Sequence, residues 1–306
     1  MRSIIILLLY FACVSCTPPP DQDKNKSQSL NEKIARVENG LQPRLQIIGL
    51  DVPKYNVEER LKELGIPGVS VAVFKDGEVE WAKGYGMADS AEQRPVTTET
   101  LFQAGSISKA VAALRALQLK EKGTLDVDAN VNDYLTSWQL PDNEFTTKEK
   151  VTTRRILTHT AGLTVHGFPG YPRKDAIPSI PDILDGKGNT DPVRVFKKPG
   201  TPFRYSGGGY TIMQQMIADL EERPFANIMD EEVLRPLGME VSTYQNPLPE
   251  QHHARAATGY HSDGSEVAGK WHVYPEMAAA GLWTTPSELI LWGKAIQQVQ
   301  QSQENG

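Results

Sequence analysis

A serine and a lysine three positions apart are the residues whose types and spacing best suit catalysis. Ser106 and Lys109 belong to the segment 102–109 (FQAGSISK), where a run of helical periodicity begins. Residues at i and i+3 of a helix lie on one face, close enough for a side-chain hydrogen bond. A serine hydroxyl is a weak nucleophile until a neighbour takes its proton, and a lysine can do so when burial or another cation disfavours its charge. The pair therefore predicts acyl transfer through Ser106.

The position of Ser106 supports this chemistry, although the spacing alone is a common one. The backbone N–H dipoles at the start of a helix favour developing negative charge. Gly105 has no side chain and would let a substrate approach closely, so we take it as substrate-binding. However, about one S-x-x-K is expected by chance in a chain of this length. A purely structural role for the pair therefore stays open at this point.

The elements that would position this pair can be predicted from apolar periodicity and from turn residues. A helix is expected over Ser106–Lys122, closed by Gly123. A hairpin is expected from Gly68–Phe74 and Glu78–Tyr85, with the turn at 75–77. Further helices are expected after Asn56 and from Pro286, each with a capping residue and a reciprocal glutamate.

The rest of the chain reads as short helices separated by loops, without long strands between 124 and 238. Helices are expected over 145–158 and 210–222, a β-type stretch around 257–274, and an irregular end over 297–306. These elements predict an α/β (α+β) fold in which an antiparallel sheet is flanked by helices. A mainly helical lobe, about 110–240, would be inserted into it. Since an isolated hairpin is only marginally stable, we expect the sheet to be incomplete in this chain.

Composition excludes several classes of protein. The chain has 306 residues, 38 acidic and 32 basic side chains, and a net charge of −6. This length suits one large domain or two lobes. A mild acidic excess without a basic stripe argues against nucleic acid as a partner. No apolar run reaches the roughly 18 residues that would span a bilayer.

The first 40 residues look like an export signal and a tether. Arg2 precedes an apolar run over 4–10, and both cysteines follow, at Cys13 and Cys16. Small residues before Cys16 resemble a bacterial lipoprotein cleavage box, although Cys13 stands where that box usually has Leu. We predict a lipoprotein-type signal peptide over 1–15, a lipidated Cys16, a flexible tether over 16–40, and an exported protein anchored to a membrane, facing the periplasm or the cell exterior. An ordinary secretory signal without lipid is the alternative.

Beyond the S-x-x-K pair, an ordered series of segments resembles the serine β-lactamase and penicillin-binding-protein superfamily. The similarity is to its branch of class C β-lactamases, D-Ala-D-Ala carboxypeptidases and esterases. The matching segments, in chain order, are 65–73 (GIPGVSVAV), 81–86 (WAKGYG), 106–109 (SISK), 157–163 (LTHTAGL), 199–206 (PGTPFRYS), 235–239 (RPLGM) and 280–285 (AGLWTT). A single short match often arises by chance, but a series of matches in the order of the family does not. The resemblance implies a β-lactamase-like fold over 41–306.

The resemblance also implies roles for individual residues. Ser106 would be acylated, Lys109 would orient or deprotonate it, and Tyr205 would match the tyrosine of the family's Y-x-N motif, which moves the proton to the leaving group. Packing at the lobe interface is the plainer explanation of Tyr205. The third position of that motif is Gly207, which we place in the substrate site although it lacks the amide that usually contacts substrate.

One element of the family is missing from the sequence. The resemblance implies a Lys-Thr-Gly or His-x-Gly triad on a strand that supplies one of two oxyanion donors. Neither K-[ST]-G nor H-x-G occurs after Tyr205. Loss of one donor costs about 100- to 1,000-fold in rate. We therefore expect a truncated member, or a fragment of a longer reading frame, that lacks the C-terminal strands.

The spacing of the histidines gives no indication of a metal or cofactor site. His252 and His253 are adjacent, which is not the spacing of a helical metal pair, and His261 and His272 have no acidic partner at a recognisable spacing. His159 lies in a segment that the resemblance makes structural. We predict no metal, no cofactor, no nucleic acid, and a small-molecule or peptide substrate; no protein partner can be inferred.

Two functions from different classes remain. The first is an exported serine hydrolase that forms an acyl-enzyme at Ser106 with ester, amide or cell-wall-type peptide substrates. The second is a truncated or degenerate relative that acts as a tethered binding protein without turnover. Fold membership does not fix the substrate, so β-lactams, D-Ala peptides and short-chain esters all stay open.

Overall fold

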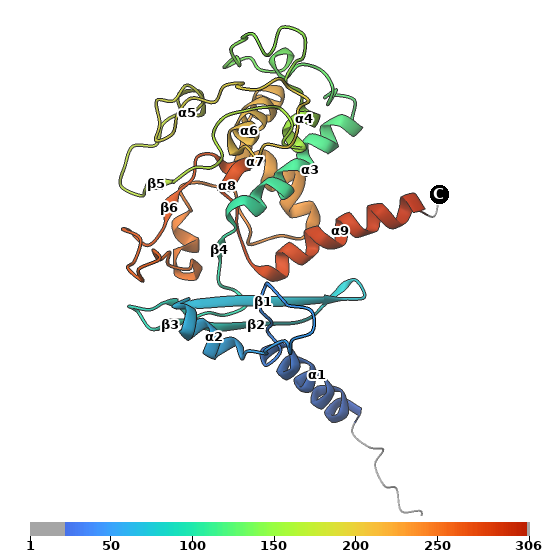
Figure 1. Cartoon of the computed structure of the whole chain (residues 1–306), viewed down its shortest axis with the longest axis vertical. Coiled ribbons are helices and arrows are strands. Elements are labelled where there is room, and N and C mark those ends of the chain that lie inside the picture. Colours follow the sequence, from blue (N-terminus) through green and yellow to red (C-terminus); the bar gives the residue numbers. More distant parts are fainter. Residues whose placement is uncertain (1–21, 305–306) are drawn as a thin grey trace, which may run out of the picture. The chain divides into compact units, whose positions relative to one another are not determined.

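The computed structural model describes residues 22–304, and Figure 1 shows its ribbon. The chain divides into two compact units, one that ends at Leu64 and one that begins at Gly65. All of the residues expected to do chemistry, apart from Cys16, belong to the second unit. The predicted signal peptide and Cys16 lie outside the described residues.

The first unit contains helix α1 (Gln22–Glu38) and helix α2 (Val57–Leu64). The tether predicted over 16–40 stays a prediction, and within that range residues 22–38 form α1. The reason is compositional: 22–38 holds no Gly or Pro and is rich in Gln, Lys and Glu, which are good helix formers. Asn56 caps α2 as predicted, since its Oδ1 accepts hydrogen bonds from the N–H groups of Glu58 and Glu59 at 2.9 and 3.3 Å.

The second unit begins with the predicted hairpin. Strands β1 (Gly68–Lys75) and β2 (Glu78–Asp89) pair antiparallel, and β3 (Arg94–Pro95) adds to β2, so that β1 is an edge of a three-stranded sheet. At Gly86, φ is +70°, and a Cβ would lie 2.2 Å from the carbonyl oxygen of Pro67. Only glycine allows the chain to approach so closely there.

The other strands are two-residue pairs. β4 (Phe102–Gln103) pairs with β7 (Trp283–Thr284), and β5 (Tyr171–Pro172) pairs with β6 (His272–Val273). The β-type stretch expected around 257–274 therefore shrinks to β6 and isolated bridges within turns. The α/β arrangement with an incomplete antiparallel sheet is confirmed.

Helices form the remainder of the second unit and lie to one side of β1 and β2 in Figure 1. They are α3 (Ser108–Glu121), α4 (Thr153–Leu157), α5 (Ile180–Leu184), α6 (Gly207–Glu221), α7 (Phe225–Met229), α8 (Met277–Ala280) and α9 (Pro286–Glu304). The core sits around α6, whose Ile212, Met213 and Met216 are fully buried. Arg115 of α3 is also buried and pairs with Glu221 at 2.5 Å and Glu232 at 3.0 Å, which fixes α3 to α6 and to the turn after α7.

Two predicted helices have different bounds in the structure. The helix expected over 145–158 is only α4, because Val151 accepts a backbone bond from Val131 and Thr152 pairs with Asn130, in extended conformation. β-Branched residues favour such a conformation. α9 continues to Glu304 through the end that we expected to be irregular, since Gln supports a helix.

Within residues 22–304, no helix has both the length and the apolarity to cross a membrane.

Candidate active site

Ser106 lies on a single 3₁₀ turn, Gly105–Ile107, that leads into α3. Gly105 has a φ of +50° with open space where a Cβ would stand, and Ser106 is exposed to solvent. Two contacts with Leu282, next to β7, hold the turn. The N–H of Ala104 donates to the Leu282 carbonyl at 2.8 Å, and the Ser108 hydroxyl accepts from the Leu282 N–H at 3.0 Å. Ser108 also donates to the Gly105 carbonyl at 2.5 Å, a role that the sequence reading missed.

Lys109 lies beneath Ser106 and is almost completely buried, with 6% of its surface exposed. Its Nζ donates to Ser106 Oγ at 3.0 Å and to the Ala279 carbonyl of α8 at 2.6 Å. Within the described residues no carboxylate forms an ion pair with it. Burial lowers the pKa of Lys109, and the hydrogen bond and charge interaction with Tyr205 oppose this effect. A desolvated lysine without a counter-ion is suited to take a proton from the serine.

Tyr205 completes the cluster that the sequence predicted. The Nζ of Lys109 lies 5.0 Å from the centre of the Tyr205 ring and 5.8 Å from that of Tyr210. Burial raises the pKa of Tyr210 to about 12, so that this second phenol stays protonated. The structure thus brings Ser106, Lys109 and Tyr205 into one site, with Lys109 between the other two.

His159 supports Tyr205 and is not placed to act on Ser106. Its Nδ1 accepts the Ser206 N–H at 3.1 Å, its carbonyl accepts the Arg204 N–H at 2.7 Å, and its ring lies 4.3 Å from that of Tyr205. Burial is the main cause that lowers the pKa of His159, and the positive charges of Lys109 and His166 add to it. A neutral imidazole whose Nδ1 is already an acceptor orients the tyrosine loop.

Gly207 begins α6 and leaves no room for a side chain. A Cβ there would lie 3.1 Å from the His166 carbonyl and 3.2 Å from the Phe168 ring. The Gly207 N–H donates to that carbonyl at 3.0 Å, and the Gly208 N–H donates to Val165 at 3.1 Å. The loop 164–168 therefore takes the space of the missing amide. It also brings the ring of His166 to 4.8 Å from Tyr205. The sequence reading missed His166, although it stands only three positions after the 157–163 segment.

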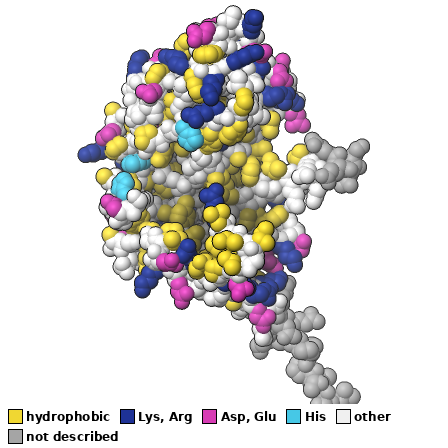
Figure 2. All heavy atoms as spheres, in the orientation of Figure 1, with side chains coloured by type: hydrophobic (Ala, Val, Ile, Leu, Met, Phe, Trp, Pro, Cys, Tyr) yellow, Lys and Arg dark blue, Asp and Glu magenta, His cyan; other side chains and the backbone are white. Residues whose placement is uncertain are grey.

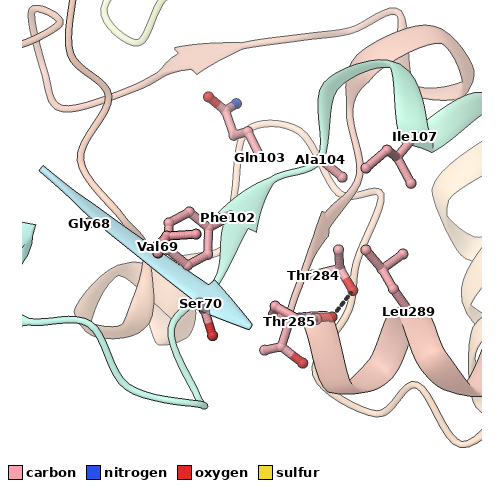
Figure 3. A pocket seen from close by; sticks show the side chains of 11 residues that line it. Gly68, Val69, Ser70, Phe102, Gln103, Ala104, Ile107, Thr284, Thr285 and Leu289 are labelled. Carbon is pink, nitrogen blue, oxygen red and sulfur yellow. Dashed lines mark hydrogen bonds between the residues drawn. The ribbon is translucent and has the colours of Figure 1, made fainter. Parts of the chain in front are cut away.

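A cavity of about 290 Å³ opens beside the nucleophile turn. Figure 3 shows Val69, Phe102, Ile107 and Leu289 among its walls, which come from β1, β4, the turn and α9. A second hollow of about 410 Å³ shares Ile107 and Leu289 with it. In Figure 2, one face of the molecule is hollowed at mid-height, with hydrophobic side chains in the hollow. These walls suit an apolar group beside Ile107 of the nucleophile turn.

Glu276 is a further titratable group that the sequence did not indicate. It precedes α8, the helix that presents Ala279 to Lys109. The residue is fully buried, and neither carboxyl oxygen has a hydrogen-bond partner within the described part of the chain. Burial raises the pKa of Glu276 to about 7. A search of residues 22–304 finds no cluster of three or more His, Cys, Asp or Glu side chains that could hold a metal ion.

Comparison with known proteins places these observations in a family. Residues 54–305 match the Beta-lactamase family. The putative penicillin-binding protein PbpX of Bacillus subtilis is 28% identical over 245 residues, which is 76% of this chain and 57% of that protein. Esterase EstB of Burkholderia gladioli is 29% identical over 250 residues, 76% of this chain and 61% of that protein.

Solved structures agree with this result. An octameric penicillin-binding protein homologue from Pyrococcus abyssi superposes with a TM-score of 0.61 at 25% identity, over 77% of this chain and 53% of that one. A class C β-lactamase gives a TM-score of 0.60 at 26% identity, over 77% and 61%. The chain thus spans about half to three fifths of the length of the proteins it matches.

Proposed function

Since this chain belongs to the Beta-lactamase family over residues 54–305, a family of serine hydrolases, we propose that it is an acylating serine hydrolase with Ser106 as nucleophile. The substrates would be esters, amides or cell-wall-type peptides. The observation that carries the proposal is the 3.0 Å hydrogen bond between Lys109 Nζ and Ser106 Oγ, made by a buried lysine without a carboxylate partner. EstB and PbpX, an esterase and a putative penicillin-binding protein, support both substrate classes.

In acylation, neutral Lys109 takes the proton of Ser106 as Oγ attacks the substrate carbonyl. The C–O or C–N bond to the leaving group then breaks, and the leaving group receives a proton through Tyr205, which Lys109 resupplies. Water later attacks the acyl-enzyme, gives one proton to the same pair, and releases the acid and Ser106. Each step moves a proton between groups that the site holds within reach of one another.

The oxyanion side of the site begins at the nucleophile turn. The backbone N–H of Ser106, on the turn that leads into α3, would be one donor to the developing negative charge.

A fluorophosphonate probe tests the proposal, because it phosphonylates an activated serine without a separate deacylation step. We expect the mass of one adduct per chain in a protein that melts cooperatively. The adduct should disappear in Ser106→Ala and persist in Ser262→Ala, which changes an exposed serine in a turn. A folded protein that never forms the adduct would sink the proposal.

A tethered binding protein without turnover is the second candidate. It is favoured by Gly207, which lacks the amide that the Y-x-N motif carries at that position. In that case the folded chain would bind a substrate analogue, measured by calorimetry, yet Ser106 would not be labelled.

Export and lipidation at Cys16 are proposed on the composition of residues 1–16 alone. Incorporation of a labelled fatty acid in a bacterial host, lost in Cys16→Ser but kept in Cys13→Ser, would support the anchor. Incorporation that survives Cys16→Ser would contradict it.

A further inference from the structure

The Tyr205 ring packs against two imidazoles that differ in their access to water. His159 is half-buried and its ring is 4.3 Å from that of Tyr205, whereas His166 is exposed and its ring is 4.8 Å away. Burial lowers the pKa of His159, and its Nδ1 already accepts the Ser206 N–H. His166 is therefore the imidazole next to Tyr205 that is open to solvent.

The backbone fixes His166 at this place. Its carbonyl accepts the Gly207 N–H at 3.0 Å, and the hydroxyl of Ser206 donates to the Thr164 carbonyl at 2.7 Å. A side chain at position 207 would lie tightly against the His166 carbonyl and the Phe168 ring, and these would have to move by a few tenths of an ångström. The absence of an amide at Gly207 and the presence of a titratable ring beside Tyr205 are thus consequences of one loop.

A charge on His166 would act on the same ring as Lys109, whose Nζ is 5.0 Å from its centre. Lys109 and His166 both lower the pKa of His159 by their positive charge, so charge on His166 is felt inside the site. The titratable groups around His166 are Tyr205, His159 and, beyond the Tyr205 ring, Lys109; Asp191 lies across the open pocket next to the loop. An imidazole changes its charge between about pH 5 and 8.

We propose that His166 is a positioning residue for Tyr205, whose imidazolium stands in place of the amide missing at Gly207 and favours release of the proton from Tyr205 and Lys109. The proposal rests on the proposed function of Ser106. A positive charge on His166 destabilises the protonated forms of Tyr205 and Lys109. The base therefore loses its proton at a lower pH. The acid limb, meaning the low-pH side of the pH–rate profile where activity is lost, is therefore displaced to lower pH. The charge on His166 causes this displacement without contact between His166 and the substrate.

The pH profile of fluorophosphonate labelling tests the role of the charge. In His166→Asn, the acid limb is expected to move up by about half to one pH unit, as a unit charge some 5–10 Å away gives at an effective dielectric of 20–80. His166→Lys, which carries a permanent charge, should keep the limb at or below that of the wild type. His261→Asn, an exposed histidine in a turn, is the control and should not change it. Equal limbs in His166→Asn and His166→Lys would overturn the proposal, because packing alone changes the rate without moving the limb.

A second measurement does not depend on activity. The histidine Cε1–H resonances are followed by NMR from pH 4 to 9 in the wild type and in Lys109→Met, with His166 assigned from His166→Asn. Removal of the lysine charge is expected to move the midpoint of the His166 titration up by about half a pH unit, while that of His261 stays in place. An unchanged His166 midpoint would overturn the proposal. If labelling fails in the wild type but this midpoint moves, the proposed function fails and the coupling stands.

Discussion

The helical part and the sheet part of the second unit differ in how completely they are packed. On α6, Ile212, Met213, Met216 and Ile217 are all fully buried. On β1, by contrast, no residue is buried: seven of its eight residues are half-exposed and the last is exposed. A fully buried helix has partners on every side, whereas an edge strand has a partner on one side only.

This difference extends to the candidate site. Lys109, Tyr205 and His159 come from the helical part, where each has defined partners. The two cavities beside Ile107 and Leu289 have walls from the sheet part and from α9. The groups proposed for proton transfer thus lie in the well-packed part of the unit, and the less well packed sheet part contributes to the cavity walls.

Loss of the buried lysine should have the largest effect. We expect Lys109→Met to lower the rate of fluorophosphonate labelling by about 100- to 10,000-fold, since general-base assistance is lost. Stability should change little, because Met fills the volume without a charge. Lys120→Met, on the exposed side of the same helix, should label like the wild type. Equal rates in both variants, measured by stopped-time mass spectrometry, would mean that Lys109 is not the base.

The buried arginine of α3 should dominate the stability of the helical part. Arg115→Met leaves Glu221 without this partner and Glu232 with Lys122 alone, and a broken buried pair costs about 3–5 kcal/mol. Arg154→Met removes an exposed pair with Asp128 and should cost less than about 1 kcal/mol. Urea unfolding of both variants measures the difference. A loss of the same size in both would contradict the assigned importance of burial.

Glu276 should make stability depend on pH. Its native pKa, raised by burial to about 7, exceeds the ordinary value of 4.5. Between these values the native state binds more protons than the unfolded state, so wild-type stability falls as the pH rises from 4.5 to 7 and then levels off. Glu276→Gln should remove about 2–3 kcal/mol of this fall, while Glu250→Gln, which changes an exposed residue, should not. Parallel stability profiles of wild type and Glu276→Gln would argue against a buried carboxyl.

Truncation of a side chain to alanine should destabilise the protein least in the sheet part. Val71 of β1 is half-exposed, and Val71→Ala is expected to cost about 1 kcal/mol in urea unfolding. Ile212→Ala, at a fully buried position of α6, should cost about 2–5 kcal/mol. A larger loss at Val71 than at Ile212 would reverse the comparison between the two parts.

Helices and strands that are marked by turn residues or capping residues were predicted from the sequence. The hairpin was predicted from its turn residues, α2 from Asn56, and α9 from Thr285 and Pro286; the structure confirms all three. The helix over 145–158 was wrong because a long-range bridge between Asn130 and Thr152 competes with local propensity. No window of the sequence contains that bridge.

For the candidate site, too, the sequence predicted the residues that are close in the chain and missed most of those brought together from distant positions. Ser106 lies on the 3₁₀ turn that runs directly into α3, and Lys109 follows three positions later, so their contact follows from local helical geometry. Tyr205 was found by resemblance alone, since nearly a hundred residues separate it from Lys109. His166, Ser108 and Glu276 carry no signal in their neighbours, because their surroundings are made by contacts with Tyr205, Leu282 and α8.

The sequence by itself determined the family, the Ser106–Lys109 pair and the absence of an amide at Gly207, because these depend on residue identity and on spacing within one element. The tertiary structure decided that Lys109 is buried without a carboxylate, that Tyr205 packs against two imidazoles, and that Glu276 is fully enclosed. Burial and charge environment are sums over atoms that the chain brings together from distant positions. They are therefore properties of the fold and not of any segment.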